Sequence, residues 1–214
     1  MAKVAVFIHG MWAKPDVWRN WRPFGTTSLG GHVADFTNTI EGLTEKPVLI
    51  GHSTGGLLTP APDAAAIATR LPNLRAFAFA RIQLEWGWWR KPHRATLAEG
   101  LSHTFNTTDP REGAERHAGF VHDSGRALFE MGLPWLDAAK AAAIDPRVVT
   151  VPLLFVAAEQ DRLTPAGVVR RVSQRFKHVS DYVEYPGQGH WVLGQPGWER
   201  IADETAVWLD SKAA

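Results

Sequence analysis

The chain has 214 residues, of which 45% are hydrophobic, so it is long enough to form one domain with a substantial core. The 23 Lys and Arg residues nearly balance the 22 Asp and Glu residues, and a net charge of +1 gives no electrostatic reason to expect a nucleic-acid or anionic-membrane partner. The absence of cysteine excludes disulfides, thiolate metal sites and a cysteine nucleophile, and it suits the cytoplasm, which we predict as the compartment. No stretch reaches the roughly 18 apolar residues that a membrane span requires.

The first part of the chain alternates short apolar runs with helical patterns. Residues 4–8 and 48–50 are continuous apolar runs, which are typical of strands buried on both faces of a parallel sheet. A short helix is predicted over 15–21, with a proline in its first turn. A second helix is predicted over 32–43, where apolar residues recur at helical spacing.

The last part of the chain repeats this alternation. Strands are predicted over 151–157 and 182–185, and helices over 165–176 and 198–211. Strands that alternate with helices indicate an α/β fold with a mostly parallel central sheet flanked by helices.

Residues 81–150 have a different character, with many helix formers and no clear strand. Four of the ten tryptophans lie in this segment: Trp86, Trp88, Trp89 and Trp135. We predict that it forms a helical cap inserted into a core domain made of residues 1–80 and 151–214. Within the cap, Asp123 and Ser124 are interpreted as the start of a helix with a capping residue rather than as a second site.

The strongest local signal is a glycine-rich turn directly after the predicted strand 48–50. Residues 51–55 read Gly-His-Ser-Thr-Gly, a G-x-S-x-G pattern. In this pattern the serine occupies a sharp strand-to-helix turn, and the glycines leave room for neighbouring backbone while the hydroxyl is exposed. Ser53 is therefore a candidate nucleophile, although a glycine-rich turn with an incidental serine would read the same.

A serine nucleophile needs a base to take its proton and a carboxylate to orient that base. Glu159 and Asp161 both follow the predicted strand 151–157, where an orienting acid is expected. His190 follows the next strand in a glycine-rich loop, which distinguishes it as the candidate base among the nine histidines. The alternative for Asp161 is a turn or helix-capping role before Pro165.

A fourth element, His9-Gly10-Met11-Trp12, lies at the end of the first predicted strand. Acyl transfer places negative charge on the substrate carbonyl oxygen, and two prealigned backbone N–H groups stabilise that charge. The N–H groups of Met11 and Thr54 are the candidates for this oxyanion hole, whereas His9 is interpreted as a structural hydrogen-bonding residue.

Three aromatic side chains flank these motifs: Trp12, His52 and Trp191. We take them as candidates for substrate binding, and the nearby tryptophans favour an apolar acyl or aryl pocket. The alternative is that each tryptophan packs the cap onto the core.

In combination, these motifs resemble the α/β-hydrolase family, in particular its small bacterial serine esterases and lipases. Four segments carry the resemblance, in this order: 4–12, 48–58, 153–165 and 185–193. The D-x-x-T-P ending that begins at Asp161 resembles the acid loop of the family and favours Asp161 over Glu159.

The resemblance implies a triad of Ser53, His190 and Asp161, an oxyanion hole from Met11 and Thr54, and a cap over the pocket. It implies hydrolysis of a small-molecule carboxylic ester through an acyl-enzyme, with no cofactor and no metal. Thioesterase, amidase, carbon–carbon hydrolase, perhydrolase and lyase chemistry use the same triad and stay open, as does a non-catalytic binding protein. The resemblance leaves the natural substrate and the oligomeric state open.

The sequence also departs from the family in two places. Residues 21–31 lead almost directly from the oxyanion strand to the next helix, where the family usually adds another helix and strand. After the elbow, Pro60 and Pro62 forbid the continuous buried helix that precedes the next central strand in the family. We therefore expect a shortened family member, or a sequence that lacks internal segments of a longer one.

Overall fold

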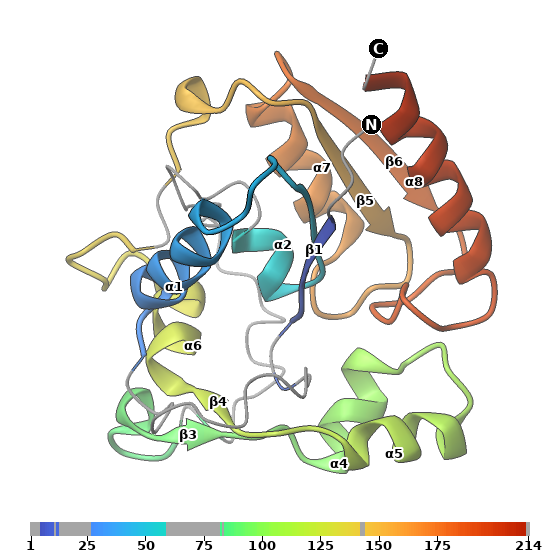
Figure 1. Ribbon diagram of the computed structural model, residues 1–214. Helices are drawn as coiled ribbons and strands as arrows, with labels where there is room; N and C mark the ends of the chain where they lie inside the picture. The colour runs from blue at the N-terminus through green and yellow to red at the C-terminus, as the bar shows by residue number, and fades with distance from the viewer. Residues whose placement is uncertain are drawn as a thin grey trace. The chain divides into compact units, whose positions relative to one another are not determined.

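The computed structural model describes residues 5–10, 12, 27–58, 82, 84–141 and 144–212 (Figure 1). The chain divides into two compact units. The N-terminal unit comprises Ala2–Ala95 and Gly119–Val148, and the C-terminal unit comprises Thr96–Ala118 and Val149–Ala214. The segment predicted as a single cap thus contributes to both units, and the predicted boundaries between core and cap stay a prediction.

Two parallel strands form the centre of the N-terminal unit. β1 (Ala5–Ile8) pairs with β2 (Val48–Gly51), and both strands lie where the apolar runs predicted them. β2 leads through two residues into the short helix α2 (Thr54–Leu58). The helix predicted over 15–21 lies outside the described residues, as do residues 21–26 of the first predicted shortening and the residues directly after Leu58 in the second.

The helix α1 (Leu29–Glu41) connects β1 to β2 and begins three residues before the predicted start. It begins there because Ser28 is its N-cap, with a side-chain oxygen that accepts a hydrogen bond from the Gly31 N–H at 3.0 Å. Leu29 is the fully buried residue of its first turn. The helix therefore starts at a cap residue that the apolar periodicity does not reveal.

The remainder of the N-terminal unit consists of short elements: η4 (Trp88–Arg90), β3 (Pro92–His93), β4 (Asp123–Ser124), α6 (Gly125–Gly132) and η6 (Pro146–Val148). β3 and β4 pair antiparallel, which corrects the expectation that residues 81–150 contain no strand. A two-residue ladder is too short to produce a recognisable alternation of apolar and polar residues. Ser124 caps α6 as predicted, since its hydroxyl oxygen accepts from the Ala127 N–H at 3.2 Å.

The tryptophans of this unit differ in exposure. Trp88 is buried and, with Trp89, packs its ring against Phe129 of α6. Trp86 is 87% exposed, although its ring meets the edge of Trp89. The η4 tryptophans therefore hold this turn onto α6, which also belongs to the predicted cap, and packing of the cap onto the core stays a prediction.

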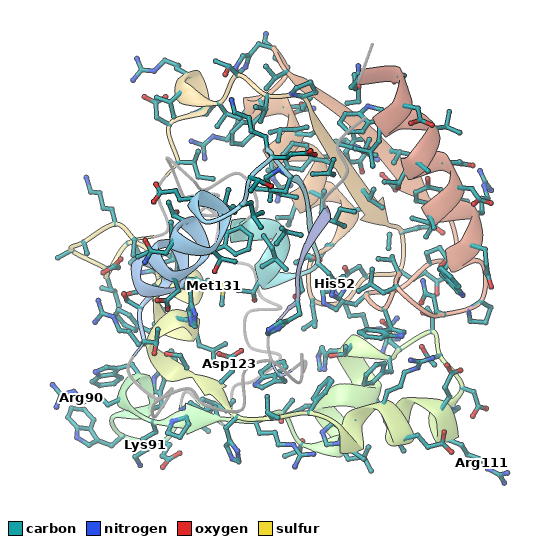
Figure 2. All side chains as sticks on the ribbon, in the orientation of Figure 1. His52, Arg90, Lys91, Arg111, Asp123 and Met131 are labelled. Atoms are coloured by element: carbon teal, nitrogen blue, oxygen red, sulfur yellow. The ribbon has the colours of Figure 1, made fainter. Side chains whose placement is uncertain are left out.

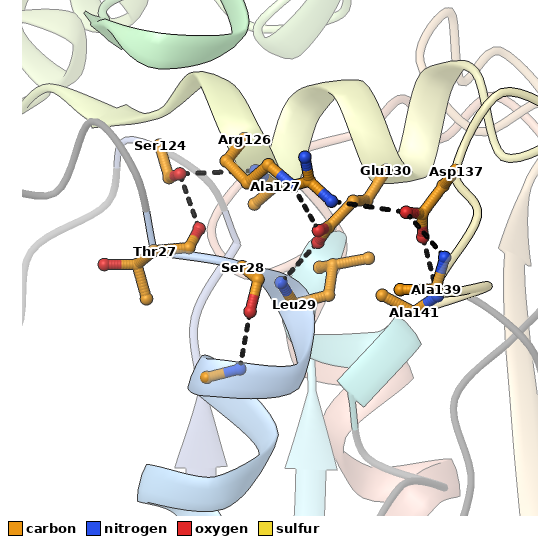
Figure 3. Close-up of polar contacts among 11 residues, drawn as sticks. Thr27, Ser28, Leu29, Ser124, Arg126, Ala127, Glu130, Asp137, Ala139 and Ala141 are labelled. Carbon is orange, nitrogen blue, oxygen red and sulfur yellow. Dashed lines mark hydrogen bonds and ion pairs between the residues drawn. The ribbon is translucent and has the colours of Figure 1, made fainter.

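A buried polar network joins α6 to the start of α1 within the N-terminal unit (Figure 3). Glu130 is 1% exposed, and its carboxylate accepts from the Leu29 N–H at 2.6 Å and from Arg126 at 2.5 Å. Arg126 also reaches Asp137, whose carboxylate accepts from two following backbone N–H groups. The negative Glu130 side chain thereby satisfies an N–H group at the positive end of the α1 dipole.

The C-terminal unit is built on the parallel pair β5 (Leu153–Ala158) and β6 (Ser180–Tyr185). The helices α7 (Ala166–Arg175) and α8 (Trp198–Lys212) complete this part, close to the predicted ranges. β5 begins after Pro152, which has no N–H group to donate to the ladder.

The helices α7 and α8 cover opposite faces of the β5–β6 pair (Figure 1). Tyr182 donates its hydroxyl to the Ala166 carbonyl of α7 at 3.4 Å. The preceding residue, Asp181, accepts from the Trp208 indole of α8 at 2.7 Å. Because successive strand residues point to opposite faces, these two helices lie on opposite sides of the pair.

The rest of the C-terminal unit is α4 (Leu97–Glu99), the π-helix η5 (Gly100–Thr104) and α5 (Pro110–Ala118). Asn106, which follows η5, donates to the Gln160 carbonyl at 3.0 Å, beside the end of β5. None of the helices within the described ranges combines the length and apolar character needed to cross a membrane. The compartment stays a prediction.

Candidate functional site

The candidate nucleophile lies on a strained turn between β2 and α2. Ser53 has a φ of 56°, in the left-handed region that a residue with a Cβ occupies at an energetic cost. Two hydrogen bonds hold the turn: the His52 N–H donates to the Ile8 carbonyl at 3.0 Å, and the Gly55 N–H donates to the His52 carbonyl at 2.9 Å. The turn therefore has the strand–serine–helix geometry that the G-x-S-x-G pattern predicts.

Two glycines leave the space that this turn requires. A Cβ added to Gly55 would lie 2.0 Å from the carbonyl oxygen of Ile8, at the end of β1. A Cβ added to Gly10 would lie 2.6 Å from the Cβ of Ser53. The end of β1 thus runs directly against the serine turn, which explains why His9-Gly10 and the elbow occur together in this sequence.

One of the two predicted oxyanion donors lies within the described part of the chain. Thr54 is the first residue of α2, directly after Ser53, whereas Met11 lies outside the described residues. The ring of His9 is bonded to the Gly10 carbonyl through Nδ1 at 2.7 Å, in agreement with its interpretation as a structural residue. His52 lies between β2 and Ser53, and its side chain is labelled in Figure 2.

The candidate base and acid form a direct pair within the C-terminal unit. His190 Nδ1 lies 2.9 Å from Asp161 Oδ2, and the two residues are 4% and 6% exposed. Asp161 follows β5, and His190 follows β6. Because β5 and β6 are parallel neighbours, their carboxyl ends bring the two loops together.

Asp161 also organises its own loop. Its Oδ1 accepts from the N–H groups of Leu163 and Thr164 at 2.7 and 2.8 Å, and its Oδ2 accepts from the Thr164 hydroxyl at 2.6 Å. Burial acts to raise the pKa of Asp161, but the charge of His190 and the hydrogen bonds from His190 and Thr164 lower it overall to about 2. Oδ1 of Asp161 therefore stabilises the turn that follows it, and Oδ2 of the ionised carboxylate is bonded to His190.

Glu159, the other acid considered, has a different partner. It is exposed, and its carboxylate accepts from the Gly187 N–H at 2.8 Å in the turn that follows β6. The structure thus pairs Asp161, rather than Glu159, with His190.

The two tryptophans predicted to bind substrate both make packing contacts in their own units. Trp12 is 4% exposed, donates its indole N–H to the His93 carbonyl at 3.0 Å and stacks on Phe120 at 6.0 Å between ring centroids. Trp191 meets Phe105 edge to face at 5.5 Å, and the guanidinium of Arg116 lies 5.5 Å from the Trp191 ring centroid. Contact of either tryptophan with substrate stays a prediction.

Ser53 belongs to the N-terminal unit, whereas Asp161 and His190 belong to the C-terminal unit. Among the residues that the structure describes, no three His, Asp or Glu side chains gather as a metal site would require.

The sequence interpretation missed two residues that support the acid and the base. Thr164 was visible as the threonine of the D-x-x-T-P ending, although no role was assigned to it. Gln195, a buried side chain in the loop after His190, has no short-range sequence signal.

Residues 21–204 match the alpha/beta hydrolase family, so the chain belongs to this family and the predicted fold class is confirmed. It is therefore a member of a hydrolase family. No curated protein matches the chain.

Solved structures support the same fold. A monoacylglycerol lipase from Paleococcus ferrophilus shares 20% identity over 97% of this chain and 94% of that chain, with a TM-score of 0.65. A thermophilic esterase from Thermogutta terrifontis shares 16% identity over 100% and 92%, with a TM-score of 0.65. The 2-hydroxy-6-oxo-6-phenylhexa-2,4-dienoate hydrolase of a Rhodococcus species, strain RHA1, shares 18% identity over 95% and 89%, with a TM-score of 0.58. At these identities the likeness shows the fold alone.

Proposed function

We propose that this chain hydrolyses carboxylic esters through an acyl-enzyme, with Ser53 as nucleophile, His190 as general base and Asp161 as the orienting acid. The observation that carries the proposal is the buried hydrogen bond of 2.9 Å between His190 Nδ1 and Asp161 Oδ2. The strained elbow at Ser53, with its φ of 56°, supplies independent support.

The pair determines which histidine nitrogen accepts the proton. Because Nδ1 of His190 is bonded to the ionised Asp161, Nε2 is the atom that takes the proton from the Ser53 hydroxyl. The carboxylate then stabilises the imidazolium that forms. The serine oxygen attacks the ester carbonyl, and His190 returns the proton to the departing alcohol. Water activated by the same histidine subsequently hydrolyses the acyl-enzyme.

The charge that develops on the carbonyl oxygen requires donors aimed at it. The proposal assigns this role to the N–H groups of Thr54 and Met11, each worth about 3 kcal/mol of barrier in comparable sites. Thr54 suits the role because it begins α2 directly after the nucleophile.

The proposed substrate is a small ester with an apolar acyl or aryl group. Trp12, His52 and Trp191 are the proposed substrate-binding residues, because they flank the oxyanion strand, the nucleophile and the base in the sequence. The lipase and the esterase among the similar folds are consistent with this substrate class.

The test measures hydrolysis of p-nitrophenyl acetate, butyrate and octanoate by the purified chain and by Ser53→Ala. We expect kcat to fall by roughly 10⁴-fold or more in the variant, because the remaining groups cannot replace the nucleophile. The control is Ser211→Ala, which removes an exposed serine hydroxyl from the last turn of α8. Labelling by a fluorophosphonate should likewise disappear only in Ser53→Ala.

Each failure has a distinct meaning. A folded wild type with neither turnover nor labelling overturns the catalytic proposal and favours a binding protein on this fold. Labelling of Ser53 without turnover of simple esters keeps the nucleophile and directs attention to thioesters, amides, carbon–carbon bonds or perhydrolysis.

A further inference from the structure

Gln195 is the most completely buried polar residue of the loop that follows His190. Its side chain is 1% exposed and lies among the largest fully buried side chains of the described residues. A buried amide is costly unless its donors and acceptor are satisfied, so its partners indicate what it holds in place.

The amide of Gln195 binds both backbone groups of Gly189, the residue before the candidate base. Its Oε1 accepts from the Gly189 N–H at 3.2 Å, and its Nε2 donates to the Gly189 carbonyl at 3.5 Å. Nε2 also donates to the side-chain carbonyl of Gln188. One side chain thus fixes the peptide groups on both sides of Gly189, and the second of these peptides is the one that carries His190.

Thr107 completes the arrangement from a distant part of the sequence. Its hydroxyl donates to Gln195 Oε1 at 2.5 Å. A Cβ added to Gly189 would lie 2.3 Å from Thr107 Oγ1, so the loop lies directly against this threonine. The histidine loop is therefore in contact with both Gln195 and Thr107, which are bonded to each other.

We propose that Gln195, buttressed by Thr107, is a positioning residue that sets the backbone of Gly189 and hence the orientation of His190 toward Asp161. This inference rests on the proposed function of His190 as general base. Gln195 acts only through the backbone, so its loss should impair proton transfer in the transition state while leaving substrate binding nearly unchanged. Displacements of about 1 Å in such groups cost up to about 10²-fold in rate.

The test compares Gln195→Leu with Tyr185→Phe. Leucine fills similar space without polar atoms, and Tyr185→Phe removes a single hydrogen bond, to Glu204, elsewhere in the same unit. We expect Gln195→Leu to lower kcat for p-nitrophenyl butyrate by about 10- to 100-fold with KM within about twofold, while Tyr185→Phe leaves both constants near wild type. A folded Gln195→Leu protein with kcat within about twofold of wild type overturns the proposal.

Thr107 provides a milder pair of variants if Gln195→Leu does not fold. Thr107→Val keeps the shape and removes the hydroxyl donor, whereas Thr107→Ser keeps the donor and removes the methyl group. We expect kcat to fall several-fold in Thr107→Val and to be restored in Thr107→Ser. Equal kcat values in these two variants would show that the hydroxyl has no positioning role and would overturn the proposal.

Proton NMR tests the positioning without any turnover. The proton between His190 Nδ1 and Asp161 should give a downfield resonance that shifts or broadens in Thr107→Val and persists in Thr107→Ser. If the proposed function is wrong, the ester turnover will persist in Ser53→Ala. In that case the resonance still decides: an identical signal in wild type and Thr107→Val overturns the positioning role.

Discussion

Among the described glycines, Gly55 is the one at which an added side chain would meet the closest contact. An added Cβ would lie 2.0 Å from the Ile8 carbonyl oxygen, 2.6 Å from the Ile8 carbonyl carbon and 2.7 Å from the His9 carbonyl oxygen. Ordinary contacts of this kind begin at 3.4 Å, so β1 would have to move by more than 1 Å. Overpacking of this size costs about 1–3 kcal/mol, and the gain of up to about 1 kcal/mol from alanine in a helix offsets part of it.

The neighbouring Gly56 supplies a matched control. A Cβ there would lie 3.1 Å from the Gly51 carbonyl oxygen, a tight contact that a shift of a few tenths of an ångström relieves. We therefore expect Gly55→Ala to be about 2 kcal/mol less stable than Gly56→Ala, although both add one methyl group to the same helix. For a chain of this length the difference corresponds to roughly 4–8 °C in Tm.

Thermal unfolding followed by circular dichroism measures the difference, and fluorophosphonate labelling reports on the elbow. Labelling of Ser53 should slow in Gly55→Ala, because the β1 end that moves also lies against the serine turn. Equal Tm values for the two variants would refute the steric reasoning. Unchanged labelling in a destabilised Gly55→Ala would refute the coupling between β1 and the nucleophile.

Two further predictions concern buried carboxylates. Because the pKa of Asp161 is lowered from 3.8 to about 2, its ionised form contributes stability above about pH 4 that is lost as the pH falls through 2. In urea unfolding, the free energy of unfolding of the wild type should therefore fall by about 2 kcal/mol between pH 7 and pH 2, and Asp161→Asn should lack this fall. The same pH dependence in both proteins would contradict the lowered pKa of Asp161. Glu130→Ala should destabilise the chain by about 3 kcal/mol, because it leaves the buried Leu29 N–H without its acceptor and removes one of the two carboxylates that Arg126 reaches. Glu130→Gln keeps an acceptor, so thermal unfolding should show a clearly smaller loss of stability than in Glu130→Ala. Equal losses of stability in the two variants would exclude a role for the Glu130 acceptor.

Local sequence patterns were sufficient to predict the strands and helices that lead to the candidate site. The apolar runs before His9 and Gly51 predicted β1 and β2, because continuous apolar runs are typical of strands in a parallel sheet. The G-x-S-x-G turn was predictable because only glycine fits where β1 crosses the elbow at Gly55. The alternation of strand and helix likewise predicted β5, α7, β6 and α8, where the candidate acid and base lie.

Periodicity alone did not distinguish Asp161 from Glu159, since both follow the same strand. The resemblance favoured Asp161, and the geometry agrees: Asp161 is buried against His190, whereas Glu159 is exposed and bonds Gly187. A choice between two acids in the same loop depends on the direction of their side chains, and that direction follows from how the loops after β5 and β6 pack.

The sequence by itself determined where the strands of the parallel pairs lie, the serine elbow and the short set of residues from which the acid and base come. Each of these shows in the sequence as a local pattern of residue types within a few positions. Only the tertiary structure decided which residues support them. Thr107 meets Gln195 across 88 positions of the chain, and Leu29 meets Glu130 across 101. A buried polar side chain is satisfied by whichever donor the fold brings to it, and such a partner leaves no trace in local spacing.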